Sequence, residues 1–286
     1  MQTARRTSVS LEIWVGTSGY VYPDWVGGFY PPGTSSRRML THYSERFPLV
    51  ELNYTFYRPP TAQGLEALAR RSPAGFRFIV KLHQSLTHDH DLAGAASFRA
   101  AVEPLRQSGC LLALLCQYPQ RFHHDRRNRE RLLALAGHFS GYPMAVEFRH
   151  RSWDEPDVPA WLGEHHLDLV SVDAPDLPNL YPTRLVQSSR LFYVRFHSRR
   201  GASWYESDKE RYNYLYSEEE LRGWLDKLAA RQGQADRAFL LFNNCRSSQA
   251  STNALQLRDL ILRSPADFRL VTPFPFAEQD KQGLLF

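Results

Sequence analysis

The sequence has few cysteines and no long apolar run. Its 286 residues include Cys110, Cys116 and Cys245, an odd and sparse set that gives no framework for disulfide bonds. The longest unbroken apolar run, Leu111–Cys116, is far shorter than the roughly 20 residues that cross a bilayer. The first ten residues are polar and lack the apolar core of a secretory signal peptide. We therefore expect a cytoplasmic protein with no membrane segment.

The sequence also lacks the short motifs of several enzyme classes. It contains no Walker phosphate loop, no GxSxG nucleophile elbow, and no HExxH or paired-cysteine zinc spacing. No glycine-rich phosphate fingerprint follows its first apolar run, as a dinucleotide-binding fold would require. The formal net charge of +5 is mildly basic, which is compatible with an anionic partner without requiring one.

Eight short apolar runs, rich in β-branched and aromatic residues, are present instead. Hydrophobic residues make up 43% of the chain, enough for a sizeable core. Strands that are buried on both faces appear as continuous apolar runs rather than as alternating ones. The runs are Ile13–Gly16, Leu49–Leu52, Phe76–Leu82, Leu111–Cys116, Met144–Phe148, Leu167–Val172, Leu191–Phe196 and Phe239–Phe242.

Most of these runs are separated by segments with helical periodicity. Ser217 and Glu220 form a capping-box pattern at the start of one segment, whereas Ala174–Arg190 contains three prolines and is expected to be an irregular loop. The helical segments are Arg37–Phe47, Ala95–Gln107, Arg126–Phe139, Val158–His165, Ser217–Arg231 and Gln249–Arg263.

Strands that alternate with helices, without a linker between them, predict an α/β fold, a (β/α)₈ TIM barrel in a single domain. A doubly wound open sheet is the alternative. We place the barrel at residues 11–273, after a disordered leader at 1–10 and before a C-terminal tail at 274–286.

Polar or ionisable residues stand at the ends of nearly all the runs. Charges inside a barrel are costly unless they pair or bind a ligand, and barrel enzymes keep their catalytic groups at the C-terminal mouth. A ring of structural salt bridges is the alternative for any one of these residues. The set is Ser18, Glu51, Asn53, Lys81, His88, Gln117, Glu147, Arg149, Asp173, Arg195, His197 and Asn243.

Each residue type indicates a role. Lys81, Arg149 and Arg195 are expected to hold phosphate oxygens, with the remaining polar residues around the substrate. The expected catalytic residues are Glu51, Glu147, Asp173 and His197. A divalent metal is a further possibility, with His88, Glu147, Asp173 and His197 as its ligands. Loops rich in tyrosine, tryptophan and arginine follow several runs, a mixture that suits stacked bases with phosphates and also sugars.

Several motifs resemble the YecE-like family, domain of unknown function 72. They include GTSGY, VELNYTFYRPP, AVEFRHRSW and YVRFH, and the match runs from about Ile13 to Pro273. The resemblance implies a TIM barrel and no settled activity, and the family's characteristic polar positions fall on the twelve residues given above. The sequence departs from the family where His197-Ser-Arg replaces His-Gly-Arg, and where Cys245–Gln249 replaces a glycine-containing loop.

The last five residues, QGLLF, resemble the peptide with which bacterial DNA-processing proteins bind the replication sliding clamp. Leu285 and Phe286 would enter an apolar pocket, and Gln282 would be the polar anchor. Alternatively, the two apolar side chains fold back on the barrel.

These features predict a DNA- or nucleotide-directed enzyme, with phosphodiester hydrolysis as its reaction and with possible help from a metal and the sliding clamp. The alternatives are a carbohydrate-active enzyme that uses Glu51 and Glu147 as paired carboxylates, and a nucleic-acid-binding protein without catalysis.

Overall fold

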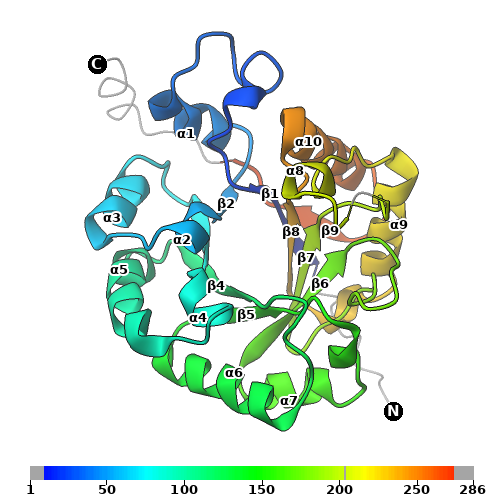
Figure 1. Ribbon diagram of the computed structural model, residues 1–286. Helices are drawn as coiled ribbons and strands as arrows, with labels where there is room; N and C mark the ends of the chain where they lie inside the picture. Colours follow the sequence, from blue (N-terminus) through cyan, green and yellow to red (C-terminus); the bar gives the residue numbers. More distant parts are fainter. Residues whose placement is uncertain (1–9, 203, 274–286) are drawn as a thin grey trace, which may run out of the picture.

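The protein is a (β/α)₈ barrel, as the sequence predicts. The computed structural model describes residues 10–202 and 204–273, and Figure 1 shows the strands around a centre with helices outside them. Strands β1 to β8 are parallel, each pairs with the next, and β8 pairs with β1 to close the ring. The strands are β1 (Leu11–Ser18), β2 (Leu49–Leu52), β3 (Arg77–Lys81), β4 (Leu111–Gln117), β5 (Met144–Glu147), β6 (Leu167–Asp173), β7 (Leu191–Phe196), β8 (Arg237–Phe242) and β9 (Phe268–Leu270).

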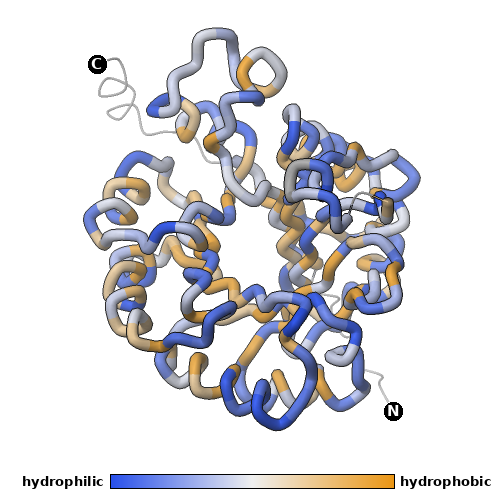
Figure 2. Tube along the Cα trace, in the orientation of Figure 1, coloured by the Kyte–Doolittle hydropathy of each residue, from blue (hydrophilic) through white to orange (hydrophobic). Residues whose placement is uncertain are grey.

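The barrel interior is a small apolar core of its own, separate from the layer between strands and helices. Figure 2 shows hydrophobic stretches along the strands and on the helices around them. Residues two apart on a strand share a face. Glu51, Glu147 and Arg195 each come two residues after an interior residue, so all three face the barrel interior near the carboxyl ends of their strands. The interior core comprises Trp14, Leu49, Ile79, Ala113, Leu115, Ala145, Val170, Leu191, Tyr193, Phe239 and Leu241.

The six predicted helical segments are all helical, with ends within three residues of the expected ones. The structure adds α3, which was not predicted because it has two turns, contains Gly64 and buries only Leu65. The helices are α1 (Ser36–Ser44), α2 (Tyr54–Tyr57), α3 (Ala62–Arg70), α4 (Gln84–Thr87), α5 (Ala95–Gln107), α6 (Arg126–His138), α7 (Val158–Glu164), α8 (Asp208–Arg211), α9 (Glu218–Ala229) and α10 (Gln249–Leu262). The 3₁₀ helices are η1 (Pro23–Trp25), η2 (Leu92–Gly94), η3 (Arg151–Trp153), η4 (Gln232–Gln234) and η5 (Arg246–Ser248).

Two local predictions are confirmed. The Ser217 hydroxyl accepts a hydrogen bond from the Glu220 backbone N–H, and the Glu220 carboxylate accepts one from the Ser217 N–H, so the capping box of α9 is complete. The proline-rich connection 174–190 between β6 and β7 has neither helix nor strand. None of the helices in the described ranges is long and apolar enough to cross a membrane.

Strand β9 was not predicted. It is three residues long and pairs with the beginning of β1, where Leu270 lies opposite Ile13. The described chain therefore ends at the half of the barrel away from the carboxyl ends of the strands, where the candidate site lies.

Candidate functional site

Arg195 is the centre of a buried ion cluster at the carboxyl ends of the strands. Its Nε donates to Glu51 Oε2 over 2.9 Å and its Nη2 to Glu51 Oε1 over 2.5 Å, while Nη1 donates to Glu147 Oε2 over 2.5 Å. The Tyr193 hydroxyl donates a fourth bond, to Glu51 Oε2 over 2.5 Å. Arg195, Glu51 and Glu147 have no solvent-exposed area, so this pairing is closed to water.

The second oxygen of Glu147 faces two further groups. Oε1 lies 2.5 Å from Arg149 Nε and 3.5 Å from His197 Nε2. Burial alone would raise the pKa of Glu147, but the charges of Arg149 and Arg195, with His197, outweigh it and hold that pKa well below its ordinary value. Glu147 is therefore a carboxylate at neutral pH and cannot act as a general acid there.

His197 is held by a chain of two asparagines. The Asn243 amide nitrogen lies 3.0 Å from His197 Nδ1, and Asn53 Nδ2 donates to Asn243 Oδ1 over 3.3 Å. Burial and the neighbouring Arg149 lower the pKa of His197 to about 3, so the ring is neutral. With Nδ1 accepting from Asn243, the ring proton is on Nε2 and points to Glu147.

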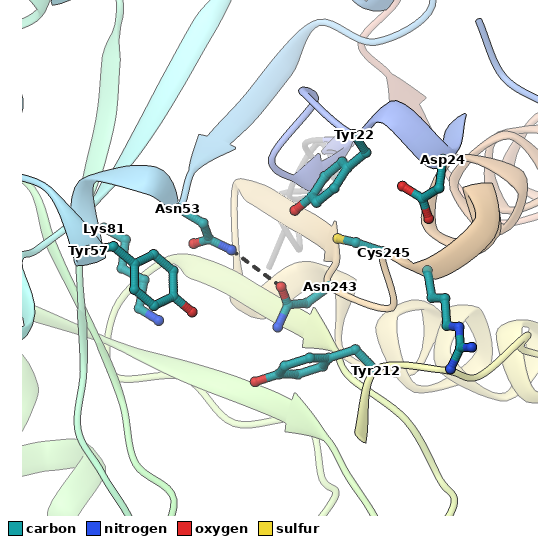
Figure 3. A pocket seen from close by; sticks show the side chains of 9 residues that line it. Tyr22, Asp24, Asn53, Tyr57, Lys81, Tyr212, Asn243 and Cys245 are labelled. Carbon is teal, nitrogen blue, oxygen red and sulfur yellow. Dashed lines mark hydrogen bonds between the residues drawn. The ribbon is translucent and has the colours of Figure 1, made fainter. Parts of the chain in front are cut away.

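Two cavities lie above this cluster and share Tyr57, Lys81 and Tyr212. The first, which we call the tyrosine cavity, has a volume of about 640 Å³ (Figure 3). It is lined by Tyr22, Asp24, Asn53, Tyr57, Lys81, Tyr212, Asn243, Cys245 and Arg246. The second, the arginine cavity, has a volume of about 460 Å³. It is lined by Phe56, Tyr57, Lys81, Gln84, His88, Gln117, Pro119, Gln120, Arg149, Leu180, Trp204, Tyr205, Arg211 and Tyr212.

Lys81 stands where the two cavities meet. It is the last residue of β3, on the interior face two positions after Ile79, and its ammonium nitrogen lies 4.0 Å from the centre of the Phe56 ring. Within the described residues, the Lys81 side chain has neither a hydrogen bond nor an ion pair, because the nearby carboxylates are occupied by Arg195. Burial, followed by the charge of Arg195, lowers the pKa of Lys81 to about 7, against the opposing effect of Glu147 and Glu51.

The arginine cavity is basic and aromatic. Lys81, Arg149 and Arg211 contribute cationic groups, and the described residues that line it include no aspartate or glutamate. The Trp204 ring lies between the two arginines, with guanidinium carbons 5.8 Å and 5.4 Å from its centre. His88 lies at the same cavity, and burial together with Lys81 lowers its pKa to about 4. The cavity therefore suits an anion that also has a flat, apolar part.

The tyrosine cavity contains one acidic group and a thiol that is not poised to react. Gly19 has φ +97°, and a Cβ there would lie 2.5 Å from the Tyr22 hydroxyl, which donates to Ser18 O over 2.6 Å. Burial raises the pKa of Cys245 to about 12, so this thiol stays protonated. Asn53 Oδ1 is buried and has no hydrogen-bond partner in the described structure.

The structure separates the twelve predicted residues into three groups. The cavities are lined by Asn53, Lys81, His88, Gln117, Arg149 and Asn243. The buried cluster beneath contains Ser18, Glu51, Glu147, Arg195 and His197, with the Ser18 hydroxyl 3.4 Å from Arg195 Nη2. Arg195 is buried and its hydrogen bonds go to these side chains, so the prediction that it binds phosphate oxygens is not supported by this geometry.

The placement of Asp173 at the mouth is wrong. On β6, Val170 faces the barrel interior, and residues two apart share a face. Asp173 is three positions after Val170, so it faces the helices. Its carboxylate accepts from Arg199 Nη2 over 2.7 Å, from Trp224 Nε1 over 2.5 Å and from the Tyr216 hydroxyl over 3.2 Å. Asp173 therefore anchors α9 and the preceding loop to the barrel and has no access to the cavities.

The predicted metal ligands do not form a site. Asp173 faces away from Glu147 and His197, and His88 Nδ1 lies 2.9 Å from the Thr87 hydroxyl instead. No group of three or more histidine, cysteine, aspartate or glutamate side chains that could hold a metal occurs within residues 10–202 and 204–273. The predicted clamp-binding residues Gln282, Leu285 and Phe286 lie outside the described residues.

Some cavity residues were noted in the sequence only as members of aromatic loops. Tyr57 and Tyr212 line both cavities, and Trp204, Tyr205 and Arg211 line the arginine cavity. The interleaving of aromatic residues with arginine was the signal for them. It could not distinguish these side chains from Trp25 and Tyr30, which have the same sequence character and are buried in the packing of the first loop.

Comparisons with known proteins agree with the fold and with the motifs. The family described as "Protein of unknown function DUF72" matches residues 14–277. The UPF0759 protein YunF of Bacillus subtilis (strain 168) is 30% identical over 273 residues, which cover 87% of this chain and 94% of that protein. A crystal structure of a DUF72 family protein from Thermotoga maritima MSB8 is similar, with a TM-score of 0.81 and 35% identity, covering 88% of this chain and all of that one. A crystal structure of a DUF72 family protein from Enterococcus faecalis V583 is also similar, with a TM-score of 0.79 and 25% identity, covering 88% of this chain and 96% of that one.

Proposed function

The chain belongs to the DUF72 family of proteins of unknown function, and from the geometry of its mouth we propose that it is an enzyme directed at nucleotides or single-stranded nucleic acid. The observation that carries the proposal is the arginine cavity, where cationic and aromatic side chains meet without a carboxylate among the described lining residues. Single-stranded nucleic acid is bound by this combination in general, because phosphates need cations and bases need flat partners.

The cavities offer a place for each part of such a ligand. Arg149 and Arg211 suit phosphate oxygens, and Lys81 adds a charge in its protonated fraction. Tyr205, which is 59% exposed, and Trp204 offer surfaces for a base.

The reaction that we propose is hydrolysis of a phosphodiester, with Lys81 as the group that takes a proton from water. A general base is most effective when its pKa is near the working pH, and the pKa of Lys81 is about 7. The proposal uses no metal, because the described residues offer no set of donors for one.

The carbohydrate alternative has less support. Cleavage of a glycosidic bond needs one carboxylic acid that can donate a proton and a second carboxylate that is free to act. Glu51 and Glu147 are both bound by Arg195 and have no exposed area, so neither is available for such a step.

The test measures binding and turnover of labelled single-stranded oligonucleotides, by fluorescence anisotropy and gel analysis, at several salt concentrations. We expect affinity to fall with rising salt, since cations on the protein release counterions from the phosphates. Tyr205→Ala should weaken binding by about 5- to 160-fold, the effect of losing one stacked base at about 1–3 kcal/mol. Arg211→Gln should also weaken binding, whereas Arg263→Gln, at an exposed position at the end of α10, should not.

Binding without cleavage would support the proposed binding site and refute the proposed hydrolase activity. Equal binding by the wild type, Tyr205→Ala and Arg211→Gln would place any nucleic acid elsewhere and refute the proposed site.

We further propose that Gln282, Leu285 and Phe286 form a sliding-clamp-binding peptide. Its support is the sequence QGLLF alone, and it concerns where the enzyme acts rather than what it does.

A further inference from the structure

We propose that Lys81 is a nucleophile that forms an imine with the carbonyl group of an open-chain sugar phosphate. The inference goes beyond hydrolysis and rests on the proposed function in one respect, that the same arginine cavity holds the phosphate. The carbonyl could belong to a free sugar phosphate or to an abasic site in nucleic acid, which in its ring-opened form carries the same aldehyde beside phosphates.

The use of lysine at this position is unusual for this chain. The sequence contains 31 arginines and four lysines, and Lys81 is the only lysine among the described residues that line the two cavities. Arginine would supply a positive charge equally well and would hold phosphate with two bonds. What lysine offers and arginine does not is an amine that can lose its proton and attack a carbonyl carbon.

The surroundings of Lys81 leave the amine free to react. Glu51 on β2 and Glu147 on β5 have their oxygens directed to Arg195, Arg149 and His197. The Phe56 ring covers one side of the ammonium nitrogen, and the remaining side opens to both cavities. Figure 3 shows the Lys81 nitrogen pointing into the tyrosine cavity beside Tyr57 and Asn243.

Electrostatics favours the neutral amine. Burial and the guanidiniums of Arg195 and Arg149 lower the pKa of Lys81 to about 7, while Glu147 and Glu51 oppose them. About half of the Lys81 side chains are then neutral at pH 7, compared with on the order of 1 in 2,500 for an ordinary lysine with a pKa near 10.4. Desolvation beside other cations is an established way to activate a lysine for carbonyl chemistry.

The step balances without any additional oxidant or reductant. The amine nitrogen attacks the carbonyl carbon, and a carbon–nitrogen bond forms as the carbon–oxygen double bond becomes a hydroxyl. The hydroxyl then leaves as water, taking one proton from solvent, while nitrogen loses its proton or keeps it as the iminium. Tyr57 and Tyr212, at the junction of the cavities, lie where they could hydrogen-bond the leaving oxygen.

The experiment traps the imine by reduction. The full chain is incubated with deoxyribose 5-phosphate, or with a single-stranded oligonucleotide that carries one abasic site, in the presence of sodium cyanoborohydride. Mass spectrometry of the intact protein and of its peptides then counts and locates the adducts. We expect one adduct per chain, on Lys81, at a rate at least 100-fold above that of any other lysine.

Variants test the assignment. Lys81→Arg keeps the charge and should lose the adduct, whereas Lys227→Arg, which changes an exposed lysine on α9, should keep it. A far-UV circular dichroism spectrum of Lys81→Arg that matches the spectrum of the wild type would show that the variant is folded. Adducts spread over several lysines, or an unchanged adduct in Lys81→Arg, would overturn the inference.

The two probes separate the sources of the carbonyl and separate this inference from the proposed function. An adduct with only one probe identifies its source, and an adduct with neither overturns the inference. If intact oligonucleotides bind but no adduct forms, the nucleic-acid proposal stands without the imine. If deoxyribose 5-phosphate is trapped on Lys81 but no oligonucleotide binds, the imine stands and the nucleic-acid proposal fails.

Discussion

Arg195 determines which charges at the barrel mouth remain available to a ligand. One guanidinium has five donors in a rigid plane, and here four of its bonds go to the carboxylates of Glu51 and Glu147 and to the Ser18 hydroxyl. Together with Arg149, which lies beside Glu147, it balances the charges of the two buried carboxylates. Lys81 is left without a counter-ion beside the cavities, and burial, followed by the charge of Arg195, lowers its pKa.

The role of Arg195 can be tested by stability. Arg195→Met should lower the free energy of unfolding by about 3–5 kcal/mol, because two buried carboxylates lose their main partner. Urea unfolding followed by tryptophan fluorescence measures the change. Arg190→Met is the matched control, since Arg190 forms an exposed pair with Asp236 just before the same strand and its loss should cost about 0–1 kcal/mol. A loss of stability in Arg195→Met no larger than in the control would contradict the structural role.

The lowered pKa of Lys81 predicts how the stability of the fold depends on pH. Its folded pKa of about 7 is below the unfolded value near 10.4, so between these values the unfolded chain binds more protons and stability rises with pH. The destabilisation by the charged lysine is at its maximum below about pH 7, and it disappears as the pH approaches 10. The groups around it are Glu51 on β2, His88 after α4, Glu147 and Arg149 at β5, and Arg195 on β7.

Lys81→Met should therefore be more stable than the wild type at pH 6–7, and the difference should shrink toward pH 10. Urea unfolding at a series of pH values measures it, with Lys227→Met as a control at an exposed position. Parallel curves for the wild type and Lys81→Met would mean that the amine titrates normally.

At the scale of elements, the strands were predictable because each is an apolar run buried on both faces, and the helices because most have an apolar stripe. The faces of the strand ends were harder to predict. Glu51 and Glu147 follow interior residues in steps of two, but nothing in β6 marks whether Val172 or Asp173 faces inward until the barrel closes. Pairing between Arg195 and carboxylates on β2 and β5 depends on the same closure, which brings together residues 144 and 48 positions apart.

Asp173 joins three elements, and its loss should affect all of them. Asp173→Asn should lower the free energy of unfolding by about 3 kcal/mol, because the charge that pairs with Arg199 and accepts from Trp224 is removed. Hydrogen exchange should increase in α9, which Trp224 anchors to β6. Asp176→Asn, which alters an exposed pair with Arg151 a few residues further along, should change stability by less than about 1 kcal/mol. Unchanged exchange in α9 would show that its apolar packing alone holds the helix.

At the scale of the whole molecule, the candidate site and the end of the described chain lie at different ends of the barrel. The cavities lie beyond the carboxyl ends of the strands, whereas β9 pairs with the first residues of β1 and the Val271 N–H donates to Ile13 O over 2.9 Å. Residue 273, from which the tail continues, therefore lies at the end of the barrel opposite the mouth. A partner tethered through the tail would be joined to the barrel at that end.

The predicted clamp peptide provides the test of such tethering. The full-length chain should bind a bacterial sliding clamp with a dissociation constant in the micromolar range, because ordering a short peptide offsets much of the gain from burying Leu285 and Phe286. A chain that ends at Lys281 should not bind, and a Gln282→Ala variant should bind more weakly. Calorimetric titration measures the three affinities, and oligonucleotide binding by each chain checks that the mouth is intact. Equal clamp binding by all three chains would refute the peptide.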